Sequence, residues 1–169
     1  PCALPQARIA AALPSGLGLT IVPKGTAYAG SEPLWWAACA AAGQSWVFGE
    51  TAERFTPHAV NLDLIGGISF NKGCYTGQEV VSRIEHIGKT NRRTVLLAAN
   101  DPLELAPGTD LTDNQGQVVA TVLYGAQLAD RTLLLAEVST ETAQSEAALD
   151  TTAATLHRLP LPYGWTRTK

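Results

Sequence analysis

Short runs of β-branched and leucine residues fill the second half of the chain, and this pattern constrains the fold more than any other feature. The runs cover residues 94–98, 118–124, 133–138 and 155–159. Residues 113–116, which read DNQG, predict a turn between two of these runs. Residues 140–150 are polar and alanine-rich and predict a loop or a short helix. Several short strands at this spacing are typical of a small antiparallel barrel or sandwich.

The first 45 residues are expected to form a helix, a strand and a second helix. The first helix candidate is the alanine-rich stretch 6–13, and the strand candidate is Gly18–Val22. The second helix candidate is Pro33–Ala42, with Ser31 or Glu32 near its cap and a proline in its first turn.

At 169 residues, the chain is long enough for one sizeable core or two small domains. Its net charge of −3 lacks the basic footprint of a nucleic-acid-binding protein, so we expect no direct contact with nucleic acid. The basic cluster Lys89, Arg92 and Arg93, with Arg83 nearby, is interpreted as solvated side chains where a strand begins.

Cysteines and histidines are too scattered for a structural metal site. They are Cys2, Cys39, Cys74, His58, His86 and His157. Tetrahedral sites usually take paired ligands close in sequence, so no metal site is expected. The odd number of cysteines suits a reducing compartment, and we expect a cytoplasmic protein.

No feature of the sequence predicts a membrane protein. The most apolar stretch, 34–48, is short and interrupted by Gly43, Gln44 and Ser45. No signal peptide is visible. The chain has no methionine, so we expect it to be a fragment or a processed piece.

Residues 72–79, which read KGCYTGQE, are the segment that most favours chemistry. Cys74 lies two residues after Lys72 and just ahead of an expected helix start, and both a cation and a helix N-terminus favour thiolate. If the backbone is extended, Lys72 and Cys74 point to the same side. Taken singly, Cys74 could be a buried hydrophobe, Lys72 a solvated side chain and Tyr75 a packing residue.

The surroundings of this octapeptide predict a strand, a loop and a helix. Residues 68–70 follow a Gly-Gly turn and are expected to form a short strand. Thr76 and Glu79 fit a capping box, with Thr76 as the N-cap. Val80, Ile84 and Ile87 follow at helical spacing and predict the buried face of this helix.

Residues 66–79 resemble the signature of the YgfZ-type folate-binding proteins. Further segments that carry the resemblance are 55–57, 61–62, 156–157 and 159–163. The resemblance covers most of the chain, most densely from 35 to 93, and matches the C-terminal half of such proteins. This family is related to the glycine-cleavage T-protein, an aminomethyltransferase, and is linked to iron–sulfur cluster biogenesis and tRNA modification.

The resemblance implies an α+β fold in three parts. Residues 1–45 would be a remnant of a ferredoxin-like, T-protein-type folate-binding region. Residues 46–90 would be a connecting segment with the signature and its helix, and residues 91–169 would form a small antiparallel Greek-key β-barrel. A further region of the same protein is expected upstream and would complete the folate pocket.

The cofactor implied by the resemblance is tetrahydrofolate. Trp35 matches a family tryptophan on the folate pocket, by ungapped spacing to Gly43 and to the octapeptide, and an indole can stack on a pterin ring. The other interpretation is that Trp35 and Trp36 are both core residues. Lys72, Tyr75 and Gln78 are the remaining expected folate-binding residues, and Lys72 would contact the anionic tail.

Two departures from the related families bear on function. Ala41 stands where family members often have a glutamate that can hold the pterin nitrogens, and Cys74 stands where T-proteins have an acidic residue. The general base of an aminomethyltransferase would also lie upstream of this chain. These points argue against simple glycine-cleavage chemistry.

The leading hypothesis is a folate-dependent accessory factor for assembly or repair of iron–sulfur enzymes, and hence for tRNA modification. Cys74 would be its reactive group, with Lys72 lowering the pKa of the thiol. Iron–sulfur enzymes or cluster-assembly proteins would be the partners. The alternatives are an aminomethyltransferase-like one-carbon transferase, a non-enzymatic folate sensor or scaffold and, more remotely, a thiol hydrolase.

Overall fold

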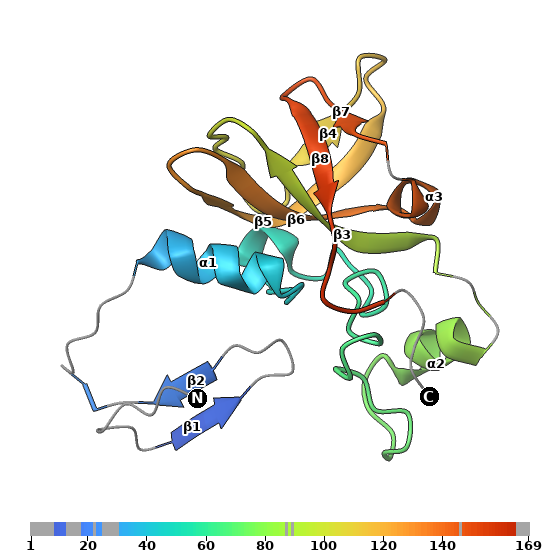
Figure 1. The fold of residues 1–169 in the computed structure, drawn as a ribbon. Helices are drawn as coiled ribbons and strands as arrows, with labels where there is room; N and C mark the ends of the chain where they lie inside the picture. The colour runs from blue at the N-terminus through green and yellow to red at the C-terminus, as the bar shows by residue number, and fades with distance from the viewer. Residues whose placement is uncertain are drawn as a thin grey trace.

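The chain folds around a six-stranded antiparallel sheet that curls into a half-barrel (Figure 1). The computed structural model describes residues 9–12, 18–21, 23–24, 31–86, 88, 90–145 and 147–164. The strands are β3 (Arg92–Ala99), β4 (Asp110–Thr112), β5 (Val118–Gln127), β6 (Thr132–Ser139), β7 (Leu149–Asp150) and β8 (Thr155–Leu159). Their order across the sheet is β4-β5-β6-β3-β8-β7. The strands and the turn expected after residue 91 are therefore confirmed, as is the α+β class.

The curl brings the two ends of the sheet together. The backbone amide of Thr152, in the turn between β7 and β8, donates to the carbonyl of Thr112 at the end of β4 over 2.8 Å. The hydroxyls of the same residues lie 3.2 Å apart. These contacts hold the last turn against the first strand in the sheet order, so the sheet bends rather than lying flat.

Both faces of the sheet are covered, which explains why its central strands are apolar throughout. One face holds a cluster that includes Val95, Leu97, Val122 and Leu134. The other face holds a second cluster that includes Leu96, Leu123, Tyr124 and Leu135. Because neighbouring residues of a strand point to opposite faces, a strand buried on both sides loses the polar alternation of a surface strand.

Helix α1 (Glu32–Ala41) lies against the second face of the sheet, over β5 and β6 (Figure 1). The Ser31 side chain accepts from the amide of Leu34 over 3.3 Å and caps the start, as the sequence predicts. The helix buries Cys39 and Ala40 against the sheet. It ends at Ala41, and Gly43 follows with a φ of +66° that favours glycine.

The expected first helix is wrong. Ile9–Ala12 forms strand β1, which pairs antiparallel with β2 (Gly18–Ile21), the expected strand. The other residues of the stretch 6–13 lie outside the described residues. The helix preference of alanine is small, and an isolated helix this short is marginal, so pairing with a neighbouring strand outweighs it.

The remaining helices are short. They are the 3₁₀ helix η1 (Gly49–Thr51), α2 (Gln78–His86) and α3 (Thr140–Gln144). Helix α3 and β7 occupy the segment 140–150 that was expected to be a loop or a short helix. In the part of the chain that the structure describes, no helix has the length and apolarity that crossing a membrane requires.

Candidate functional site

The signature segment forms an irregular loop that precedes α2 and extends away from the sheet (Figure 1). Residues 68–70 form no strand, so that expectation is wrong; a short apolar segment needs a neighbouring strand, and these residues have none. Cys74 lies in this loop as a free, exposed thiol. Cys39, by contrast, is fully buried, and burial raises the pKa of its thiol. Cys2 lies outside the described residues.

Lys72 is held by an aromatic ring of the same loop. Its Nζ lies 4.5 Å from the centroid of the Tyr75 ring, which is the geometry of a cation–π contact. Tyr75 is half-buried, and its amide donates to Oε1 of Gln78 over 3.3 Å. The structure therefore joins Lys72, Tyr75 and Gln78 in one chain of contacts beside Cys74.

The start of α2 differs from the predicted capping box. The helix begins at Gln78, and the Val81 amide donates to the carbonyl of Gly77, whose φ is +85°. No hydrogen bond joins Thr76 and Glu79, both of which the structure describes, so Thr76 is not the N-cap. The side chain of Gln78 instead turns back to the loop.

The buried face of α2 is also shifted from the prediction. Val81 is buried, whereas Val80 is 43% exposed. Ile84 is half-buried, and Ile87 lies outside the described residues. The buried side of α2 therefore runs through Val81 and Ile84, three residues apart, and leaves Val80 at its margin.

Trp35 lies on α1 and not beside the signature loop. It is half-buried and packs against the cluster formed by Cys39, Leu123 and their neighbours on the sheet. Trp36 belongs to an aromatic group, with its ring centroid 5.4 Å from that of Phe48 and 5.5 Å from that of Tyr124. No contact brings Trp35 to the Lys72–Gln78 segment among the described residues, and its role at a folate pocket stays a prediction.

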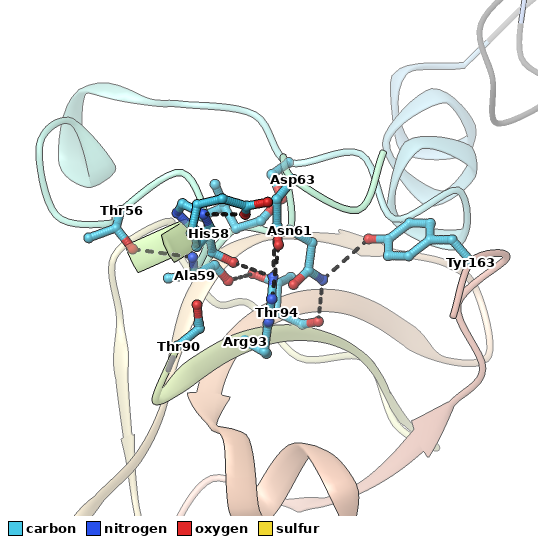
Figure 2. A network of polar contacts seen from close by, with 12 residues as sticks. Thr56, His58, Ala59, Asn61, Asp63, Thr90, Arg93, Thr94 and Tyr163 are labelled. Atoms are coloured by element: carbon cyan, nitrogen blue, oxygen red, sulfur yellow. Dashed lines mark hydrogen bonds and ion pairs between the residues drawn. The ribbon is translucent and has the colours of Figure 1, made fainter. Parts of the chain in front are cut away.

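A buried ion pair lies between the segment ahead of the signature and the sheet (Figure 2). Arg93 of β3 donates to both carboxylate oxygens of Asp63, over 2.7 and 2.9 Å. The side chains of Asp63 and Arg93 are only 5% and 13% exposed. The same guanidinium donates to the carbonyl of His58 over 2.8 Å. Arg93 is therefore a structural anchor, and its interpretation as a solvated side chain is wrong.

Arg92 is ion-paired as well. Its Nε donates to Glu137 of β6 over 2.6 Å. Arg83 is exposed on α2, and Lys89 lies outside the described residues. The basic cluster is thus divided by the alternation of β3, because Arg92 and Arg93 point to opposite faces and meet different carboxylates.

Asn61 and Tyr163 link four distant segments of the chain (Figure 2). The Asn61 side chain donates to the carbonyl of Thr94 over 2.8 Å and to the Tyr163 hydroxyl over 3.3 Å. The Tyr163 hydroxyl in turn donates to the carbonyl of Gly43 over 2.9 Å. Burial raises the pKa of Tyr163, against the opposing effect of the hydrogen bond from Asn61. These hydrogen bonds therefore tie the turn around Asn61 to β3, to the end of α1 and to the segment around Tyr163.

An open pocket of about 410 Å³ lies where residues 68–71, just ahead of the signature loop, meet the end of α2. Its lining residues are Ile68, Ser69, Phe70, Asn71, Glu85 and His86. His58 is only 2% exposed; its Nε2 lies 3.7 Å from Oε2 of Glu85, and its ring centroid lies 6.4 Å from that of Phe70. Glu85 and Phe70, which both line the pocket, thus lie beside the buried imidazole of His58.

Sequence reasoning missed the buried polar group and the pocket beside it. The missed residues are His58, Asp63, Glu85 and Arg93, and Asn61 and Tyr163 entered only through the resemblance. A signal was present in the polar residues of the otherwise apolar segment 58–63, since buried polar side chains need partners. Their partners lie far along the chain, so no spacing rule could assign them.

The described residues contain no group of three or more His, Cys, Asp or Glu side chains that could hold a metal ion. In a comparison with models of known protein families, the chain matches none of them.

Proposed function

We propose that this protein is a tetrahydrofolate-binding accessory factor in the assembly or repair of iron–sulfur enzymes, and hence in tRNA modification. The observation that carries the proposal is the exposure of Cys74 in a loop whose base is held by buried polar contacts. A thiol must be accessible to attack or be attacked, and Cys74 meets that condition while Cys39 does not.

The curled six-stranded sheet is compatible with this proposal. We infer that residues 91–169 are the Greek-key barrel of the resemblance, since the curled six-stranded sheet has the curvature of a barrel wall. Residues 1–45 would then be the remnant of a ferredoxin-like folate-binding region, and residues 46–90 the connecting segment. A further region of the same protein would complete the pocket.

In this proposal, Cys74 is the reactive group and Lys72 helps to hold the loop. The contact of Lys72 with Tyr75, and of Tyr75 with Gln78, supports a loop of defined shape rather than a free one. Tetrahydrofolate would contact Lys72, Tyr75 and Gln78 from the side that the upstream region covers, with Trp35 in the same pocket. The protein partners would be iron–sulfur enzymes or cluster-assembly proteins in the cytoplasm.

The first experiment tests the thiol in the full-length protein. We expect Cys74→Ser to abolish rescue of iron–sulfur enzyme activity in cells that lack the protein, without lowering the melting temperature, because the side chain is exposed and makes no core contact. Thr76→Ala, an exposed neighbour, is the matched control and should rescue fully. Full rescue by Cys74→Ser would remove the reactive-thiol proposal.

The second experiment tests the cofactor. Tetrahydrofolate is titrated calorimetrically into the full-length protein, its Trp35→Ala variant and a Trp46→Ala control on an exposed tryptophan. We expect binding to the protein and to the control, and weaker binding to Trp35→Ala. An absence of binding heat in all three proteins would remove the folate assignment.

A further inference from the structure

Two tryptophans, a valine and a phenylalanine form a partly exposed apolar surface at α1 and the segment that follows it. The ring centroid of Trp36 lies 6.0 Å from that of Trp46 and 5.4 Å from that of Phe48. Val47 stands between Trp46 and Phe48 in the chain and is 76% exposed, and Trp46 is 42% exposed. Single exposed apolar side chains are common, but a connected group is typical of an interaction surface. We call these four residues the aromatic surface.

Both indole N–H groups of the aromatic surface already have partners within the protein. Nε1 of Trp36 donates to Oε1 of Glu32 over 3.2 Å. Burial raises the pKa of the Cys39 thiol, and a hydrogen bond from the Trp46 side chain opposes that rise. Because an indole can only donate, the parts of the two rings that remain in water are hydrocarbon. Covering them with an apolar partner is therefore favourable.

The aromatic surface rests on a rigid base. Trp36 and Phe48 both pack against Tyr124, which is 2% exposed, with ring centroids 5.5 and 5.8 Å away. The Tyr124 hydroxyl donates to the carbonyl of Gln44, and the Phe48 amide donates to the Thr51 side chain over 2.9 Å. A surface that is fixed in this way loses little conformational freedom when a partner binds.

Exposed carboxylates border the aromatic surface. Glu32 is hydrogen-bonded to Trp36, and Glu50 and Glu53 follow Phe48 within five residues. All three side chains are exposed. In the part of the chain that the structure describes, none of these three carboxylates forms an ion pair.

The cation next to these carboxylates is already neutralised. Arg54 donates to the carboxylate of Asp110 over 3.1 Å and to the carbonyl of Gly108. The surroundings of the aromatic surface therefore carry an excess of negative charge. Such a field repels the phosphates of nucleic acid and of anionic lipid, whereas it attracts a cationic side chain.

We propose that the aromatic surface docks a segment of a partner protein in which an arginine stands next to a large apolar side chain. The arginine lies on the exposed face of Trp46 and pairs with Glu32 or Glu50, and the apolar side chain packs on Val47. Arginine fits this combination best, because its flat guanidinium stacks on an indole and also pairs with carboxylates. Tryptophan and arginine are also the residues that contribute most at protein interfaces.

This interface goes beyond the proposed function, because it needs neither tetrahydrofolate nor the Cys74 thiol. Trp46→Ala should lose binding of the partner segment while retaining binding of tetrahydrofolate. Loss of the folate proposal therefore leaves the interface standing, and loss of the interface leaves the folate proposal standing.

The test measures binding of a rhodamine-labelled peptide, Arg-Leu-Arg-Leu-Arg, to the full-length protein by fluorescence anisotropy. Peptides with lysine or glutamate in place of arginine are the matched probes. We expect the arginine peptide to bind more tightly than the lysine peptide, and the glutamate peptide not to bind measurably. Raising the salt concentration should weaken binding, because the paired charges are exposed. Equal binding of the arginine and glutamate peptides overturns the proposal.

Substitutions then locate the binding on the protein. Glu32→Gln combined with Glu50→Gln should weaken binding of the arginine peptide by about twofold to tenfold, as the loss of two exposed ion pairs predicts. Val47→Ser should weaken it by about threefold to tenfold, because less hydrocarbon is buried. Two exposed controls elsewhere, Glu141→Gln on α3 and Val118→Ser on β5, should leave it unchanged. Equal effects of these variants and their controls overturn the proposal.

Indole NMR signals give a readout that does not depend on any variant folding. In the unaltered protein, the arginine peptide should shift the sequentially assigned N–H signals of Trp36 and Trp46. An absence of shifts in both signals overturns the proposal.

Two further outcomes assign the aromatic surface to another occupant. If Val47→Ser lowers the melting temperature of the full-length protein by several degrees, another part of the same chain covers the surface. If the protein forms a dimer in analytical ultracentrifugation and Val47→Ser weakens it, a second copy covers the surface. Either outcome overturns docking of a separate partner, whereas an unchanged melting temperature and a monomeric protein support it.

Discussion

The buried anchor and the signature loop differ in almost every physical respect. We use "buried anchor" for Arg93, Asp63, Asn61 and Tyr163, whose polar atoms find partners across long sequence separations. The signature loop, residues 72–78, is largely exposed, and its contacts join residues three positions apart. The buried anchor fixes the segments that it joins, whereas the signature loop leaves the thiol of Cys74 accessible to solvent.

This contrast indicates that the buried anchor contributes to stability and that the signature loop carries the proposed reactive group. A buried ion pair that loses one partner leaves a charge in a medium that solvates it poorly. An exposed cation–π contact contributes only about 0.5–1 kcal/mol, because water competes for the cation. Changes in the anchor should therefore affect unfolding, and changes in the loop should affect reactivity.

The largest effect is expected from breaking the buried ion pair. Arg93→Met leaves Asp63, which is 5% exposed, without its partner and should lower the free energy of unfolding by about 3–5 kcal/mol. Urea unfolding followed by circular dichroism measures the change. Arg131→Ala removes the exposed Arg131–Asp130 pair and is the control, with no measurable change expected. An equally small loss for Arg93→Met would mean that the anchor is not a stabilising element.

The next effect concerns the contact between the end of α1 and the C-terminal segment. A Cβ at Gly43 would lie 2.5 Å from the Tyr163 hydroxyl oxygen, and the φ of +66° is already unfavourable for alanine. Gly43→Ala should cost about 2–4 kcal/mol, from backbone strain and displacement of Tyr163. Gly116→Ala has a similar φ of +79° but open space, and should cost only about 1–2 kcal/mol. Equal losses in thermal or urea unfolding would show that Tyr163 can move away at no cost.

Alkaline pH should weaken the same region. Burial raises the pKa of Tyr163 and of Tyr124, so the folded protein holds these protons where the unfolded chain, with a tyrosine pKa of about 10, has released them. Stability is unaffected below that pH and falls as pH rises above it. Urea unfolding between about pH 9 and pH 11 measures the slope. The slope should be smaller in the Tyr124→Phe, Tyr163→Phe double variant; an unchanged slope would assign it to other groups.

The last prediction compares the alkylation rates of the two described thiols, Cys39 and Cys74, and involves no change in stability. In a Cys2→Ser background, iodoacetamide should modify Cys74 much faster than Cys39, because Cys74 is exposed while burial both shields Cys39 and raises its pKa. Mass spectrometry of tryptic peptides over time measures both rates. Comparable rates would mean that α1 separates readily from the sheet.

The strands of the sheet were largely predictable. Residues 155–159 form β8 with the predicted bounds, and the runs at 94–98, 118–124 and 133–138 form most of β3, β5 and β6. Their apolar residues are buried on both faces of the sheet, so the runs stand out from the polar turns between them. The helix α1 was predictable because its proline, its cap and its final glycine act locally.

The candidate site was predictable only where its contacts are local. The sequence puts Lys72, Tyr75 and Gln78 in one short segment, and the structure joins them by contacts three residues apart. Cys74 is exposed in the same segment, and its role as a reactive thiol stays a prediction. The start of α2 was misplaced because Gly77 adopts a positive φ that ends the loop one residue later than the capping pattern implied. The pair His58–Glu85 had no signal, since a loop and a helix had to meet before it formed.

By itself, the sequence determined the β-rich second half, the helix α1 and the segment that presents the thiol, because these depend on periodicity, caps and turns within a few residues. Only the tertiary structure decided that Ile9–Ala12 is a strand, that Arg93 is buried against Asp63 and that Glu85 faces a pocket backed by His58. The physical reason is that a strand partner, an ion-pair partner or a pocket wall contributes free energy only when residues far apart in the chain come together. The conformational preference of a few neighbouring residues does not depend on those distant partners.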